Sequence, residues 1–141
     1  MNKDPKFHEL VKDCVKAAQD CIITSQGLIN INSQNMVEWN NHTQEAIESY
    51  FYVSEKFKHL IDYCNNQSIN DHKELTSLSK KIIDECNNMI NQCNTKPSTA
   101  LPAQLSALKL QIVQSIIDNS IPCIEACSEF LHDYGNDSLL P

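Results

Sequence analysis

The chain has 141 residues, 41% of them hydrophobic and 21% charged, which suits one domain with a continuous core and excludes a disordered or low-complexity protein. Its formal net charge is −7, and all eleven basic residues are lysine. Because nucleic-acid sites need clustered lysine and arginine, DNA and RNA are poor candidate partners. The presence of only two glycines favours helices joined by short turns.

The N-terminus does not have the pattern of a signal peptide, since residues 1–14 are charged and contain no apolar segment. No apolar run approaches the ~18 residues that a membrane-spanning helix needs. We therefore expect a cytoplasmic protein with no membrane span, in which the seven cysteines are reduced. Export by a route that uses no N-terminal signal stays open.

A first helix is expected from Asp4, with Asp4 as N-cap and Pro5 as the first helical residue. Its apolar seam follows a seven-residue repeat made of Phe7, Cys14, Cys21 and Leu28, with Leu10, Ala17 and Thr24 three places after the first three. Such a seam is typical of a helix in a bundle. Gly27 and the polar residues 30–33 predict the end of this helix and a turn.

A second helix is predicted from about residue 34 to residue 64, because a heptad pattern persists over four repeats. One position of the repeat holds Met36, Thr43, Tyr50, Phe57 and Cys64, and the other holds Trp39, Ala46, Val53 and Leu60. Val37 and Phe51 fall off this seam, which predicts exposed apolar surface on the second helix.

A third helix is predicted after Asp71 and Glu74, which form a capping box. Its apolar stripe consists of Leu75, Leu78, Ile82, Ile83, Cys86, Met89, Ile90 and Cys93. Pro97 ends the helix, because the residue before a proline is pushed out of helical geometry.

The fourth helix, which extends to Tyr134 before the C-cap Gly135, is apolar on every side between Leu105 and Ile124. Its surplus apolar residues, Leu110, Val113, Ile117 and Ile124, exceed what one bundle seam can bury. Either they form an interface or this helix is the most buried of the four. Pro122 either kinks one long helix or begins a fifth, and a single kinked helix is the preferred prediction.

These segments predict an all-α fold, an antiparallel up-down-up-down four-helix bundle with a kink at Pro122 in the last helix. Residues 1–135 are expected to form a single domain, and residues 136–141 a flexible C-terminal tail.

The seven cysteines all fall on the predicted seams and should point into the bundle: Cys14, Cys21, Cys64, Cys86, Cys93, Cys123 and Cys127. With a rise of ~1.5 Å per residue in helices of alternating direction, Cys14 should lie level with Cys123, and Cys21 with Cys86. Buried free cysteine often serves as a small hydrophobic residue. Thiols that line a core also suit Cu(I), which prefers sulfur ligands.

The thiol-lined interior resembles that of the cytosolic copper-storage proteins, which are four-helix bundles with cysteines along the core. The resemblance depends on Cys14 with Cys21, on Cys86 with Cys93, on Cys64, and on the Cys123 to Cys127 step. That family has repeated CxxxC pairs on several helices, whereas this chain has one such pair. The resemblance therefore implies a few metal sites and not a high-capacity store.

No grouping of residues in the sequence indicates catalysis, and no resident cofactor is expected. Our first functional expectation is a non-enzymatic interaction module, a homo-oligomer or a partner of another protein. The expected interface comprises Val37, Phe51, Leu110, Val113, Ile117 and Ile124. The alternative is a thiol-lined bundle that binds Cu(I) through the seven cysteines.

Overall fold

A computed structural model describes residues 4–30, 36–67, 73–95 and 102–135 of the chain, without the side chains of residues 36–37 and 102–109. The predicted flexible tail at 136–141 and the predicted cap residue Asp71 lie outside these ranges. The interface residue Val37 belongs to a described helix, but its side chain is not part of the description.

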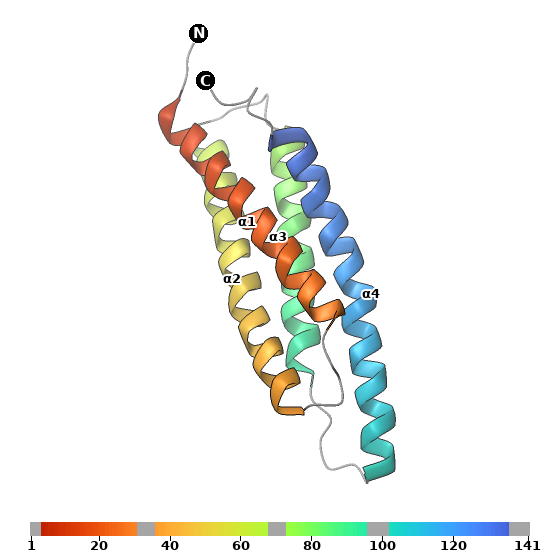
Figure 1. The fold of residues 1–141 in the computed structure, drawn as a ribbon. Helices are drawn as coiled ribbons and strands as arrows, with labels where there is room; N and C mark the ends of the chain where they lie inside the picture. Colours follow the sequence, from red (N-terminus) through yellow and green to blue (C-terminus); the bar gives the residue numbers. More distant parts are fainter. Residues whose placement is uncertain (1–3, 31–35, 68–72, 96–101, 136–141) are drawn as a thin grey trace.

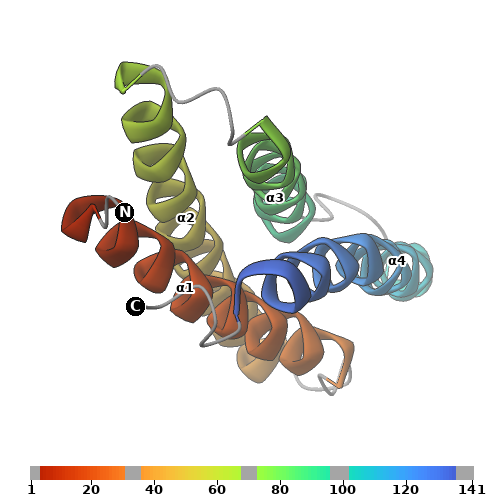
Figure 2. The same cartoon turned by 90° about the horizontal axis from the view of Figure 1, so that it is seen from above.

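The described residues form helices and no strands (Figure 1), which confirms the predicted all-α class. The helices are α1 (Pro5–Ile29), α2 (Met36–Asn66), α3 (Lys73–Asn94) and α4 (Pro102–Tyr134). Each helix packs against the next one in the chain, and α4 packs against α1, as in a four-helix bundle (Figure 2). None of the described helices has the length and apolarity needed to cross a membrane.

The helix ends follow from local chemistry at a few residues. The Asp4 carboxylate accepts hydrogen bonds from the backbone N–H groups of Lys6 and Phe7, which confirms the predicted N-cap of α1. The same helix continues past Gly27 to Ile29 and is capped by Asn30, the first residue of the polar segment that predicts its end. At the other terminus the backbone N–H of Gly135 donates to the Leu131 carbonyl at 2.8 Å and closes α4.

Pro122 lies inside α4, which continues from Pro102 to Tyr134 as one helix. The alternative of a separate fifth helix that begins at Pro122 is therefore wrong. The helix tolerates the proline because its segments on both sides pack against neighbouring helices, with Ile116 and Phe130 fully buried. The bend at Pro122 stays a prediction.

The core follows the seams that the sequence predicts, most completely in α2. Every member of that seam from Trp39 to Cys64 is buried. Phe57 of α2 meets Phe130 of α4 edge to face, with the ring centroids 4.9 Å apart. Deeper in α2, the Tyr50 hydroxyl lies 2.6 Å from the Ser25 hydroxyl of α1, which satisfies both buried polar groups.

Side-chain pairs between neighbouring helices show how two pairs of helices are aligned. Between α1 and α2 the pairs are Asp4 with Tyr63, Cys14 with the Lys56 carbonyl, and Thr24 with Ser49. Between α3 and α4 they are Lys81 with Glu129, Asn88 with Asn119, and Gln92 with Ser115. In both pairs of helices, residue numbers rise along one helix as they fall along the other.

Replacement of Phe57 by alanine should lower the free energy of unfolding by about 3 to 5 kcal/mol, because the ring is completely buried against Phe130. The matched change Phe51→Ala on the same helix should stay within about 0.5 kcal/mol, because that ring is 57% exposed. Urea denaturation followed by circular dichroism measures both values. Similar losses in the two variants would contradict this description of the core.

Candidate metal centre

All seven predicted cysteines are free thiols and all are buried. The structure divides them into a central group and three outlying residues. The central group comprises Cys21, Cys86, Cys123 and Cys127, which come from α1, α3 and α4. The outlying thiols are Cys14, Cys64 and Cys93.

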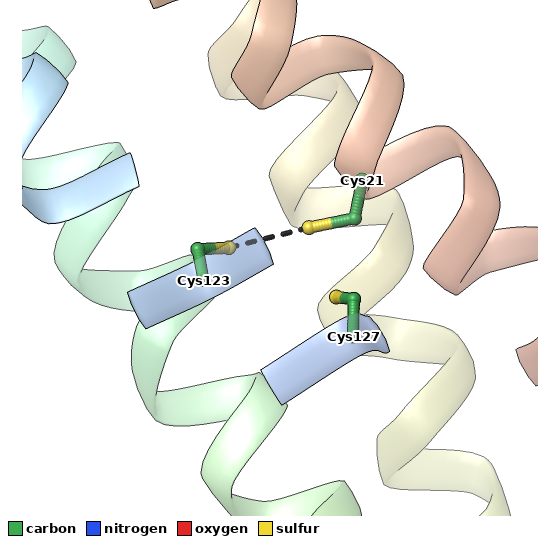
Figure 3. A group of neighbouring side chains, drawn as sticks. All are labelled: Cys21, Cys123 and Cys127. Atoms are coloured by element: carbon green, nitrogen blue, oxygen red, sulfur yellow. Dashed lines mark hydrogen bonds between the residues drawn. The ribbon is translucent and has the colours of Figure 1, made fainter. Parts of the chain in front are cut away.

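Three sulfur atoms of the central group lie close enough together to share one ligand. The Sγ atoms of Cys21, Cys123 and Cys127 are all within 4.8 Å of one another, and Cys21 Sγ lies 3.3 Å from Cys123 Sγ. Figure 3 shows the three side chains converging, one from α1 and two from α4. Cys123 and Cys127 share a face because they are one helical turn apart.

Cys86 of α3 extends this group to a fourth thiol. Its Sγ atom lies 3.9 Å from Cys21 Sγ, which agrees with the prediction that these two residues share one level of the bundle. It does not belong to the set whose sulfur atoms all lie within 4.8 Å of one another. Cys86 is therefore a neighbour of the three-thiol cluster that Cys21, Cys123 and Cys127 form.

The predicted pairing of Cys14 with Cys123 is wrong, because Cys21 lies beside Cys123 instead. Cys14 donates a hydrogen bond from its thiol to the Lys56 carbonyl at 3.3 Å. The prediction assumed helices of alternating direction whose axes are not inclined to one another and whose ends lie at the same two levels. Figures 1 and 2 show α1 inclined to α3, and Figure 1 shows α4 reaching beyond the other helices, so equal residue counts do not give equal heights.

Hydrogen bonds within the group concentrate negative charge on one sulfur. Interactions with the Cys127, Cys21 and Cys86 thiols hold the pKa of Cys123 below its ordinary value, against the opposing effect of burial. Ser25 adds a further hydrogen bond to Cys123. Cys127 and Cys86 have a raised pKa, first because of these hydrogen bonds and then because of burial. A negative charge in the cluster is therefore best held on Cys123, with the neighbouring thiols neutral.

The buried polar side chains of the core carry no charge, and the nearest charged group is the half-buried Glu85 of α3, whose carboxyl pKa is raised by burial and then by Cys123. In the described part of the chain, the fully buried polar side chains are hydroxyls: Ser25, Thr43, Tyr50, Ser54, Ser79 and Ser120. Tyr50 stays protonated, since burial raises the pKa of its phenol. No buried lysine or carboxylate in this part of the chain supplies a counter-charge, so the thiols themselves must balance any bound ion.

The outlying cysteines are ordinary core thiols. Burial raises the pKa of Cys93 to about 12 and raises the pKa of Cys14 and Cys64 as well. None of these three sulfur atoms belongs to the set that lies within 4.8 Å of one another. These three residues therefore pack as small hydrophobic side chains.

The predicted interface residues fall on two separate surfaces, because α2 and α4 are not neighbouring helices in the described part of the bundle. Phe51 on α2 is 57% exposed and Leu110 on α4 is 64% exposed. Val113, Ile117 and Ile124 of α4 are half-buried. The sequence analysis missed Ile121, which is 49% exposed and could have been found from its position four residues after Ile117.

Neither a protein-family model, nor a curated protein, nor a solved structure matches this chain. The three-thiol cluster is the feature of the described residues with the clearest chemical meaning. Thiolate sulfur is a soft ligand that binds Cu(I), Zn(II) and iron–sulfur clusters. Three sulfur atoms from two helices can hold one such ion without a change of fold.

Alkaline pH should destabilise the protein through its buried thiols, and Cys93 allows a clean test. Its folded pKa is about 12 against an ordinary value of 9.0, so above pH 9 the unfolded chain loses this proton while the folded chain keeps it. The contribution of Cys93 is fully present below pH 9 and falls by about 1.4 kcal/mol per pH unit until the folded pKa is reached.

Urea denaturation of the wild type and Cys93→Ala, at several values from about pH 8 to 11, measures this contribution. The wild type should lose stability more steeply than the variant above pH 9. The cavity that alanine leaves costs the same at every pH, so it does not alter the slope. Parallel curves for the two proteins would contradict the assignment.

Proposed function

We propose that this bundle binds one Cu(I) ion between Cys21, Cys123 and Cys127. The observation that carries the proposal is the position of three buried sulfur atoms within 4.8 Å of one another. With a metal–sulfur bond of about 2.3 Å, the value typical of zinc, three sulfurs around one ion lie about 4 Å apart. The thiols therefore need only a small adjustment to close around the ion.

The number and the type of the ligands favour Cu(I) over Zn(II). Structural zinc sites are almost always four-coordinate, whereas this cluster offers three sulfurs, with Cys86 outside it. Each cysteine binds the ion as a thiolate and releases its proton to solvent, so the charge of the site does not separate Cu(I) from Zn(II). Sulfur ligands without carboxylate or imidazole are also the set that Cu(I) prefers.

The proposed protein is a cytoplasmic, non-enzymatic copper-binding bundle of small capacity. Free thiols are the state expected in a reducing compartment, where copper is held as Cu(I). One three-thiol cluster supports a single ion, so buffering or transfer of copper fits better than bulk storage. The three outlying cysteines are left out of the proposed site.

The directions of the helices and a bend at Pro122 both bear on the proposed site. We infer that the helices alternate in direction, up-down-up-down, and the opposed order of side-chain pairs in α1 with α2 and in α3 with α4 supports this. A bend at Pro122 would act directly on the site, because Cys123 follows the proline and Cys127 lies one turn further.

Anaerobic titration of reduced protein with Cu(I), against a chromophoric chelator that competes for the ion, tests the proposal. We expect tight uptake of one equivalent. The variants Cys21→Ala, Cys123→Ala and Cys127→Ala should each lose more than the roughly 10- to 100-fold that follows removal of an outer-shell partner. Cys93→Ala is the matched control and should bind as the wild type does.

Two further results decide between the possible sites. If Cys86→Ala binds Cu(I) normally, the site has three ligands, and a loss as large as that of Cys123→Ala would make it a four-thiol site. A parallel titration with Zn(II) should give weaker uptake. Failure of the wild type to bind Cu(I), or equal binding by folded Cys123→Ala, would overturn the proposal.

A further inference from the structure

The outer side of α4 carries a continuous apolar stripe. It consists of Leu110, Val113, Ile117, Ile121 and Ile124, and is called the α4 stripe below. Successive steps of three, four, four and three residues keep all five side chains on one side of the helix. The stripe covers fourteen residue steps, or about 21 Å of helix.

Other parts of the described chain leave this stripe incompletely covered. Leu110 is 64% exposed and Ile121 is 49% exposed, while the three residues between and beyond them are half-buried. Single exposed hydrophobic residues are common, but a row of five on one side of a helix marks an interface. Cys123 and Cys127 point to the core from the same helix, so the stripe is distinct from the thiol cluster.

The spacing of the stripe is symmetric about Ile117. Leu110 and Ile124 each stand seven residues from it, and Val113 and Ile121 each stand four residues from it. Between Leu110 and Ile124 the sequence has one charged residue, Asp118, whose carboxylate accepts a hydrogen bond from the Gln114 amide at 2.8 Å. A surface with this symmetry is complementary to a second copy of itself turned end to end.

We propose that a second copy of this chain docks on the α4 stripe, with the two α4 helices antiparallel and Ile117 on the twofold axis. In this arrangement Leu110 faces the partner's Ile124, and Val113 faces the partner's Ile121. Apolar side chains then meet at all five levels of the stripe. The inference goes beyond copper binding and does not depend on it.

The size of the stripe sets the strength of the dimer. Two helices that touch along about 21 Å bury much less surface than the roughly 1,600 Å² of a typical stable interface. A reversible dimer with a dissociation constant in the micromolar range, about 8 kcal/mol, is therefore expected. The dimer should be visible as a mass that rises with concentration.

Sedimentation equilibrium of the full-length, reduced, metal-free protein tests the inference. The wild type should pass from monomer to dimer as its concentration rises through the micromolar range. Leu110→Glu and Ile121→Glu should each weaken the dimer at least tenfold, since both side chains are exposed in the monomer. Phe51→Glu is the matched control, because it places the same charge on an exposed apolar position of α2.

A mixture of two variants tests the orientation. If the helices are antiparallel, Leu110→Glu mixed with Ile124→Lys should form a heterodimer that is at least tenfold tighter than either homodimer, because glutamate then faces lysine. A parallel pair would not bring these positions together. If the mixed dimer is no tighter than either homodimer, the antiparallel arrangement is wrong.

Two results would overturn the docking surface itself. One is a wild type that stays monomeric at every concentration, and the other is a dimer that Phe51→Glu disrupts and Leu110→Glu leaves intact. Far-UV circular dichroism checks that each variant keeps its helical content. Because the measurements use metal-free protein, they stand apart from the outcome of the Cu(I) titration.

Discussion

The arrangement of this protein depends on the burial of several thiols in a core that holds no charged side chain among the described residues. An isolated buried charge is expensive, so each cysteine must stay neutral or share its charge with hydrogen-bond donors. Cys14, Cys64 and Cys93 follow the first course, with raised pKa values. The thiols of the central group interact with one another around Cys123, and this sharing of charge distinguishes them from the other core cysteines.

The meeting of α1 with α4 creates that difference. Two thiols one turn apart on a single helix present adjacent sulfurs, and the third sulfur of the cluster has to come from a neighbouring helix at the same level. Cys21 supplies it, and the hydroxyl pair of Ser25 and Tyr50 lies one turn further along, where Ser25 also reaches Cys123. Metal ligands are commonly held in place by such outer hydrogen bonds.

Much of the fold could be predicted from the sequence, because heptad seams and caps are local signals. The α2 seam and the burial of all seven cysteines required only periodicity, and the Asp4 cap required only the residue types of Asp4 and Pro5. The composition of the cluster could not be predicted in the same way. Whether Cys14 or Cys21 faces Cys123 depends on the inclination of α1, which follows from packing of whole helices and leaves no mark at either residue.

The two faces of α4 explain why this helix is more apolar than a bundle seam requires. Ile121 and Ile124 alternate in the sequence with Cys123 and Cys127, yet the former lie toward the outside and the latter in the core. A rotation of α4 that buried more of the outer stripe would turn the two thiols away from Cys21. Within the described part of the chain, burial of the stripe and closure of the thiol cluster therefore exclude each other, and a second molecule on the stripe, as proposed above, would leave the cluster intact.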